Sequence, residues 1–166
     1  MRGEGFVIKT GVSEIPTAFL ATYGSGGPVI GILAEFDALP GLSQDSVPIR
    51  KIKVEGGPGH ACGHHLFGTA SVAAAVTLKD WLIKNQKAGT VKLFGTPAEE
   101  GGSAKVYMVR DGLFDDVDVV LHWHPSSAND ASPQSCLSIK QTIFKFYGKS
   151  AHAAAAPQAG RSALDG

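Results

Sequence analysis

Short apolar runs alternate with a helical pattern over the part of the chain that precedes Pro125. Three early runs predict strands over residues 5–9, 17–23 and 28–35, and the Gly-Ser-Gly-Gly sequence at 24–27 predicts a hairpin turn between the last two. The third run is apolar almost throughout, which is typical of a strand that is buried on both faces of a sheet.

A helical pattern follows over residues 66–85. Its first half is small and apolar on almost all sides, which predicts tight packing beneath a sheet. Further strands are predicted over residues 91–95 and 117–123, with a short helix over 103–111 between them. Alternating strands and helices indicate an α/β layered domain with a largely parallel sheet.

The pattern changes after Pro125. Residues 126–135 are small and polar, which predicts a linker, and a partial alternation over 137–147 predicts a strand of a second unit. A helix is expected to begin near Arg161. We therefore expect two domains, over residues 1–130 and 131–166.

The composition is that of a folded globular protein, since 43% of the 166 residues are hydrophobic and 18% are charged. The 15 basic residues balance the 15 acidic ones, so no net charge favours nucleic acid or an anionic membrane. No apolar run has the length of a membrane-spanning helix, and the start lacks a secretory signal pattern. Two cysteines do not form a disulfide framework, so we expect a cytoplasmic protein.

The strongest chemical signal is Gly-His-Ala-Cys-Gly-His-His at residues 59–65, which precedes the predicted long helix. Thiolate and imidazole are ligands that zinc prefers, and Gly63 allows a tight turn between Cys62 and His64. The alternative is a buried cysteine beside surface histidines. The density of the cluster favours a metal site, because catalytic sites use such groupings.

Two adjacent carboxylates, Glu99 and Glu100, follow directly on a short apolar strand, where open α/β sheets bind their ligands. A metallohydrolase needs one carboxylate to hold metal and a second, unligated one to take a proton from the attacking water. The alternative is two solvated glutamates at a helix N-terminus, where the helix dipole favours negative charge.

The third signal is the pair His122 and His124, which follow an apolar strand at a spacing that puts both side chains on one face. The alternative is one histidine bonded in the core and one exposed. Mixed cysteine, carboxylate and histidine ligation is typical of catalytic metal sites. The three motifs together predict a metal-assisted hydrolase. The alternatives are a thiol enzyme with Cys62 as nucleophile, a non-catalytic metal-binding subunit, and a truncated inactive homologue.

The sequences GILAEFDALPG, GHACGHH, TPAEEGG, HWHP and GKSAHAAAAP occur in this order, and in them the chain resembles the aminoacylase/carboxypeptidase family of zinc metallopeptidases. It is most similar to the amidohydrolase branch, which contains indole-acetyl-amino-acid hydrolases and p-aminobenzoyl-glutamate hydrolases. The resemblance implies a layered α/β/α catalytic domain of the zinc-exopeptidase type, with a mixed, largely parallel sheet, over residues 1–130. Residues 131–166 would then begin an α+β lid or dimerisation domain.

The resemblance also implies roles for the first two motifs. Cys62 and His64 correspond to metal ligands, with the thiolate placed to bridge two divalent ions, zinc or manganese. Glu100 corresponds to a further ligand and Glu99 to the general base. Asp37 corresponds to an aspartate that orients a ligand.

Two further roles concern histidines. His124 is favoured over His122 as a metal ligand, because the most similar branch has histidine directly before proline. His152 corresponds to a lid histidine that polarises the substrate carbonyl, often across a subunit interface. His65 stands where many members of the family have aspartate or asparagine.

The implied substrate is a small amide, namely an N-acyl or N-aroyl amino acid or dipeptide such as p-aminobenzoyl-glutamate. The implied assembly is a homodimer or hetero-oligomer that forms through the lid domain. Chains of this family are much longer, with an additional N-terminal helix and a final metal-binding histidine near the C-terminus. We therefore expect this chain to be a fragment.

Overall fold

The structure is a computed structural model that describes residues 1–132 and 135–165. The chain forms two compact units, Met1–Ala128 and Asn129–Gly166. The predicted linker over 126–135 spans the division between them, and its residues 133 and 134 lie outside the described residues.

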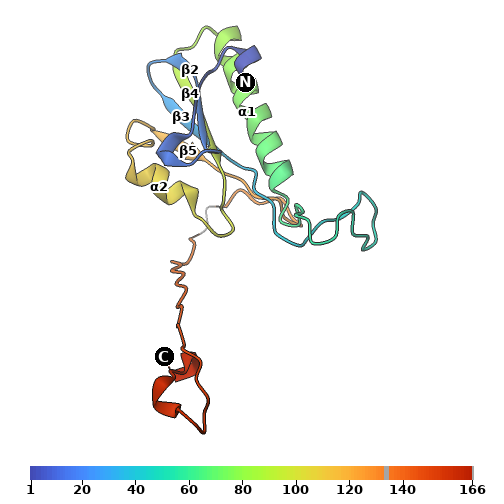
Figure 1. Ribbon diagram of the computed structural model, residues 1–166. Coiled ribbons are helices and arrows are strands. Elements are labelled where there is room, and N and C mark those ends of the chain that lie inside the picture. Colours follow the sequence, from blue (N-terminus) through green and yellow to red (C-terminus); the bar gives the residue numbers. More distant parts are fainter. Residues whose placement is uncertain (133–134, 166) are drawn as a thin grey trace. The chain divides into compact units, whose positions relative to one another are not determined.

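A mixed five-stranded sheet forms the centre of the first unit (Figure 1). Its strands are β1 (Val7–Thr10), β2 (Phe19–Ser25), β3 (Val29–Glu35), β4 (Gly89–Thr96) and β5 (Val119–Leu121). The strand order is β1-β2-β4-β3-β5, with β2 antiparallel to β1 and β4, and β3 parallel to β4 and β5. The predicted layered α/β fold with a mixed sheet is therefore confirmed.

The predicted hairpin at residues 24–27 is wrong, because β4 lies between β2 and β3. Val91 of β4 pairs with Tyr23 on one side and with Ile30 on the other. β4 is buried along almost its whole length, and a strand that is apolar on both faces is stabilised most at the centre of a sheet. The turn at 24–27 therefore connects two strands that do not pair with each other.

Two α-helices accompany the sheet, and Figure 1 shows them on opposite sides of it. They are α1 (His64–Lys84) and α2 (Ala104–Arg110), and short 3-10 helices span Arg2–Glu4, Val12–Glu14, Pro157–Ala159 and Ala163–Asp165. Leu93 and Phe94 of β4 point to opposite faces, as neighbours in a strand do. Leu93 belongs to the core beneath α1, whereas Phe94 stacks on Phe114 with ring centroids 4.2 Å apart.

Helix α1 packs on β3 and β4 through one buried stripe. Phe67, Ser71, Ala75 and Lys79 follow one another at intervals of four residues and form this stripe. The tight packing expected for the helix is therefore confined to one face. Within the described residues, α1 is the one helix long and apolar enough to cross a membrane, but its stripe on the sheet is that of a core helix.

The start of α1 lies very close to the end of β3. A Cβ atom added to Gly68 would lie 2.8 Å from the carbonyl oxygen of Glu35, so a larger residue there would push the helix away from the strand. Because β3, β4 and β5 are mutually parallel, their carboxyl ends lie at one edge of the sheet. This geometry brings the three sequence motifs together.

In the second unit, the strand predicted over 137–147 is wrong. The backbone there belongs to no ladder among the described residues, and Ile139, Phe144 and Phe146 are exposed. Alternating side chains stabilise a strand only where a neighbouring strand completes its hydrogen bonds. The helix expected near Arg161 is reduced to the 3-10 turn Ala163–Asp165.

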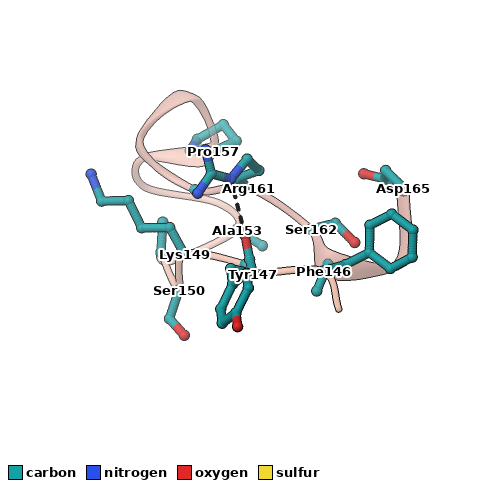
Figure 2. Close-up of a pocket in the computed structure, with 13 residues that line it drawn as sticks. Phe146, Tyr147, Lys149, Ser150, Ala153, Pro157, Arg161, Ser162 and Asp165 are labelled. Atoms are coloured by element: carbon teal, nitrogen blue, oxygen red, sulfur yellow. Dashed lines mark hydrogen bonds between the residues drawn. The ribbon is translucent and has the colours of Figure 1, made fainter. Parts of the chain in front are cut away.

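Residues 146–165 of the second unit fold into a small loop that encloses a pocket (Figure 2). Lys149 and Arg161 pair through two backbone hydrogen bonds of 2.8 and 2.9 Å. The side chain of Arg161 also donates from Nε to the carbonyl oxygen of Tyr147 at 3.2 Å, as Figure 2 shows. These bonds tie the two ends of the loop to each other.

Candidate metal centre

The turn Cys62-Gly63-His64 forms the centre of the site and begins helix α1. Gly63 is the N-cap of the helix and has left-handed backbone angles, φ 80° and ψ 15°, which glycine adopts without strain. A Cβ atom at this position would lie 3.0 Å from Cγ of Pro125. Gly63 therefore permits both the turn and its close packing on the segment that carries His124.

This packing brings Cys62 and His124 together, although 62 residues separate them in the sequence. Sγ of Cys62 lies 3.4 Å from Nε2 of His124. One ligand atom each from Cys62, His64 and His124 lie within 4.8 Å of one another, a spacing that fits a single metal ion. Zinc commonly binds this combination of one thiolate and two imidazoles.

His64 is fully buried and faces two carboxylates. Its Nδ1 is hydrogen-bonded to Oδ1 of Asp37 at 3.1 Å, and its Nε2 has no hydrogen-bond partner. Metal-binding histidines usually donate their second ring N–H to such a carboxylate, which fixes the tautomer and the ring orientation. The orphaned Nε2 is therefore suited to bind a cation.

Glu99 and Glu100 lie on a strained turn after β4. Ala98 has a left-handed φ of 57°, which costs free energy for any residue with a Cβ and often marks a functional site. Oε2 of Glu99 lies 3.9 Å from Nε2 of His64, while the side chain of Glu99 is 41% exposed. The backbone N–H of Glu100 donates to Oδ2 of Asp37 at 3.1 Å, so Asp37 connects this turn to His64.

Burial raises the pKa of the Cys62 thiol above its ordinary value. A hydrogen bond with Glu100 and the negative charges of Glu100, Glu99 and Glu35 raise this pKa further. A cysteine nucleophile needs a lowered pKa and a nearby cation or base that favours the thiolate. This environment therefore weighs against a thiol enzyme.

His122 and His124 have different partners. β5 ends at Leu121, so the two histidines lie beyond the strand, and the spacing argument for a shared strand face does not apply. His124 contacts Cys62, whereas Nε2 of His122 lies 3.5 Å from Oε1 of Glu35. Among the described residues, the ligand groups within reach of one ion include His124 and not His122.

A family model for "Peptidase family M20/M25/M40" matches residues 31–157, which include all of this site. The chain belongs to this family. It is 47% identical over 166 residues to one of the two subunits of the p-aminobenzoyl-glutamate hydrolase of Escherichia coli, covering 99% of this chain and 34% of that protein. It is 38% identical to the Xaa-Arg dipeptidase of Mus musculus, covering 91% of this chain and 33% of that protein.

A solved M20 structure supports the same grouping. The YXEP protein of Bacillus subtilis, described as a dinuclear metal-binding peptidase, matches with a TM-score of 0.60 and 28% sequence identity. The match covers 75% of this chain and 34% of that one. The chain therefore spans about a third of the length of the relatives that it matches.

The remaining M20 residue expected from the sequence, His152, lies in the second unit and is exposed. Its Nδ1 accepts hydrogen bonds from the backbone N–H groups of Ala154 at 3.2 Å and Ala155 at 3.0 Å. In a neutral ring the proton is therefore on Nε2.

Sequence reasoning missed three residues of the site. Phe67 is fully buried, and its ring contacts those of His64, His122, Trp123 and His124 at centroid distances of 5.0 to 6.3 Å. Glu35 is buried at the end of β3, where Lys105 of α2 forms an ion pair with it. The available signal for Glu35 was an acidic residue at the end of an otherwise apolar strand.

Proposed function

We propose that this chain carries the metal site of a metal-dependent amidohydrolase. The observation that supports this most is the cluster of Cys62, His64 and His124 within 4.8 Å, with a carboxylate oxygen of Glu99 3.9 Å from Nε2 of His64. Structural zinc sites more often use four cysteine or histidine ligands in a closed set, whereas a site with fewer protein ligands and a neighbouring carboxylate is typical of catalysis.

The proposed ligands are Cys62, His64, His124 and Glu100, which fit divalent zinc or manganese by their mixed soft and hard donor atoms. The thiolate of Cys62 is the group that could be shared by two ions. Bound divalent ions supply Lewis-acid chemistry, which makes a water molecule acidic near neutral pH and polarises a carbonyl. Asp37 holds the His64 ring through Nδ1 and leaves Nε2 available.

Glu99 is the proposed general base. Its carboxylate is partly exposed and adjoins the ligand cluster, so it can reach both the site and an entering water molecule. It takes the proton from the attacking water and then gives it to the leaving amine, so that the amide C–N bond breaks and the carboxylate and amine products form. Glu100 cannot do the same while it is bound to metal.

His152 is the proposed donor to the substrate carbonyl oxygen. Because its Nδ1 accepts two backbone hydrogen bonds, Nε2 carries the ring proton and is free to donate. A donor aimed at a developing oxyanion lowers the barrier of acyl transfer. Whether His152 acts in its own subunit or in a neighbouring one depends on the assembly.

The proposed substrates are N-acyl or N-aroyl amino acids or dipeptides, with a p-aminobenzoyl-glutamate-like amide as the first to test. The relatives named p-aminobenzoyl-glutamate hydrolase and Xaa-Arg dipeptidase support an amide adjoining an amino acid. Two different subunits of the Escherichia coli hydrolase are similar to this chain, which supports assembly with a second, related subunit. We propose a cytoplasmic location on the composition and cysteine content alone.

Glu99→Gln in the full-length protein tests the proposal. The variant should keep its bound metal and lose roughly 100- to 10,000-fold in the rate of p-aminobenzoyl-glutamate hydrolysis, the usual contribution of a general base. Glu14→Gln, an exposed glutamate outside the site, is the matched control and should hydrolyse normally. Normal turnover by Glu99→Gln would refute the assignment, and metal binding without hydrolysis by the wild type would favour a non-catalytic metal-binding subunit.

A further inference from the structure

The buried carboxylate of Glu35 adjoins the candidate ligands, and the mechanism proposed above gives it no part. Glu35 is the last residue of β3 and is 2% exposed. Lys105 forms an ion pair with its Oε1, and Nε2 of His122 lies 3.5 Å from the same oxygen. Its Oε2 lies 3.2 Å from Nε2 of His64. Side chains from three different segments thus converge on one carboxylate.

The contact between Glu35 and His64 joins two acceptor atoms. Nδ1 of His64 is hydrogen-bonded to Asp37, while Nε2 of His64 and Oε2 of Glu35 are buried without hydrogen-bond partners. A neutral imidazole carries one N–H, and the bond to Asp37 places it on Nδ1. The lone pair of Nε2 then faces a carboxylate oxygen, and a cation beside both atoms stabilises this arrangement.

The ion pair with Lys105 explains how Glu35 is kept in this position. A buried carboxylate without a partner is strongly destabilising, and the ammonium group of Lys105 offsets that cost. Because Lys105 and His122 both approach Oε1, the carboxylate cannot rotate freely and Oε2 remains directed at His64. Lys105 lies in the first turn of α2, directly after the turn that carries Glu99 and Glu100.

We propose that Glu35 is a positioning residue of the metal centre. Held by Lys105, its carboxylate fixes the His64 ring and places negative charge beside Nε2, and it thereby strengthens the binding of a divalent cation. His122 belongs to this carboxylate cluster and not to the ligand set. The inference rests on the proposed function, because it concerns the same metal site.

The affinity of the full-length protein for Zn²⁺ or Mn²⁺ tests the proposal, measured by competition with a chelating dye. Loss of a group that orients a ligand typically weakens metal binding about 10- to 100-fold, and we expect this for Glu35→Gln. Asp116→Asn is the matched control, because it removes the same charge from the ion pair with Lys92, which adjoins none of the candidate ligands. Its metal affinity should equal that of the wild type.

Lys105 provides a second pair of variants if Glu35→Gln does not fold. Lys105→Met keeps most of the aliphatic stem and removes the charge, and it should weaken metal binding, whereas Lys105→Arg should restore it. Thermal unfolding of the metal-free variants separates a general loss of stability from a loss of affinity in folded protein.

Wild-type affinity in the folded Glu35→Gln or Lys105→Met variant would overturn the role of Glu35 and leave the proposed function intact. A wild-type protein that binds no divalent metal would overturn the proposed function, and this inference with it.

Discussion

Gly63→Ala should damage both the stability of the first unit and its metal site. An alanine would have to adopt the left-handed conformation at φ 80°, which costs about 1–2 kcal/mol for a residue with a Cβ. The new methyl group would also lie 3.0 Å from Cγ and 3.1 Å from Cβ of Pro125. Overpacking of this kind typically costs about 1–3 kcal/mol, so we expect a total loss of roughly 2–4 kcal/mol.

Gly11→Ala separates these two contributions. Gly11 also has a left-handed φ of 67°, but a Cβ atom there would meet no atom within 4 Å. Urea unfolding of both variants should therefore show the conformational cost alone in Gly11→Ala and the larger loss in Gly63→Ala. Because relief of the Pro125 contact moves Cys62 away from His124, we expect Gly63→Ala to lose metal affinity as well. Equal losses of stability and unchanged metal affinity would refute this reasoning.

Three further predictions concern the surroundings of the site. Phe67→Ala should lower the unfolding free energy by about 3–5 kcal/mol in urea titrations, because it empties a fully buried site among four other rings; a loss below about 1 kcal/mol would show that these rings repack. His124→Ala should abolish tight metal binding in dye competition, whereas His122→Ala should only weaken it, and the reverse order would contradict the ligand assignment. The hydrogen bond from Lys92 lowers the pKa of Asp116, so its stabilisation exists above the ordinary aspartate pKa of about 3.9 and is lost as pH falls through the lowered folded value. Asp116→Asn should therefore be less stable than the wild type at pH 6, by no more than about 1 kcal/mol for so exposed a pair, and the difference should vanish in acid.

Local patterns in the sequence were sufficient to predict most elements of the first unit. The helix predicted over 66–85 corresponds to α1 (His64–Lys84), and the run over 28–35 corresponds to β3 (Val29–Glu35). These elements have strong apolar periodicity, which depends only on neighbouring residues. The turn around Gly63 was predictable for the same reason, since Cys62 and His64 adjoin it in the sequence.

Contacts between distant segments were not predictable in this way. The hairpin at 24–27 failed because β4 pairs with both flanking strands, and pairing order depends on which strand is buried most. The strand over 137–147 failed because alternation specifies a face and not a partner. The ion pair between Glu35 and Lys105 joins residues 70 positions apart, so a local pattern gave no sign of it.

The most direct test of the central claim is the metal content of the purified full-length protein, measured together with p-aminobenzoyl-glutamate hydrolysis before and after chelation. The account predicts bound zinc or manganese, cleavage that stops when a chelator removes the metal, and recovery when the metal is restored. Cleavage that survives complete removal of metal, or a protein that binds no metal under reducing conditions, would contradict it.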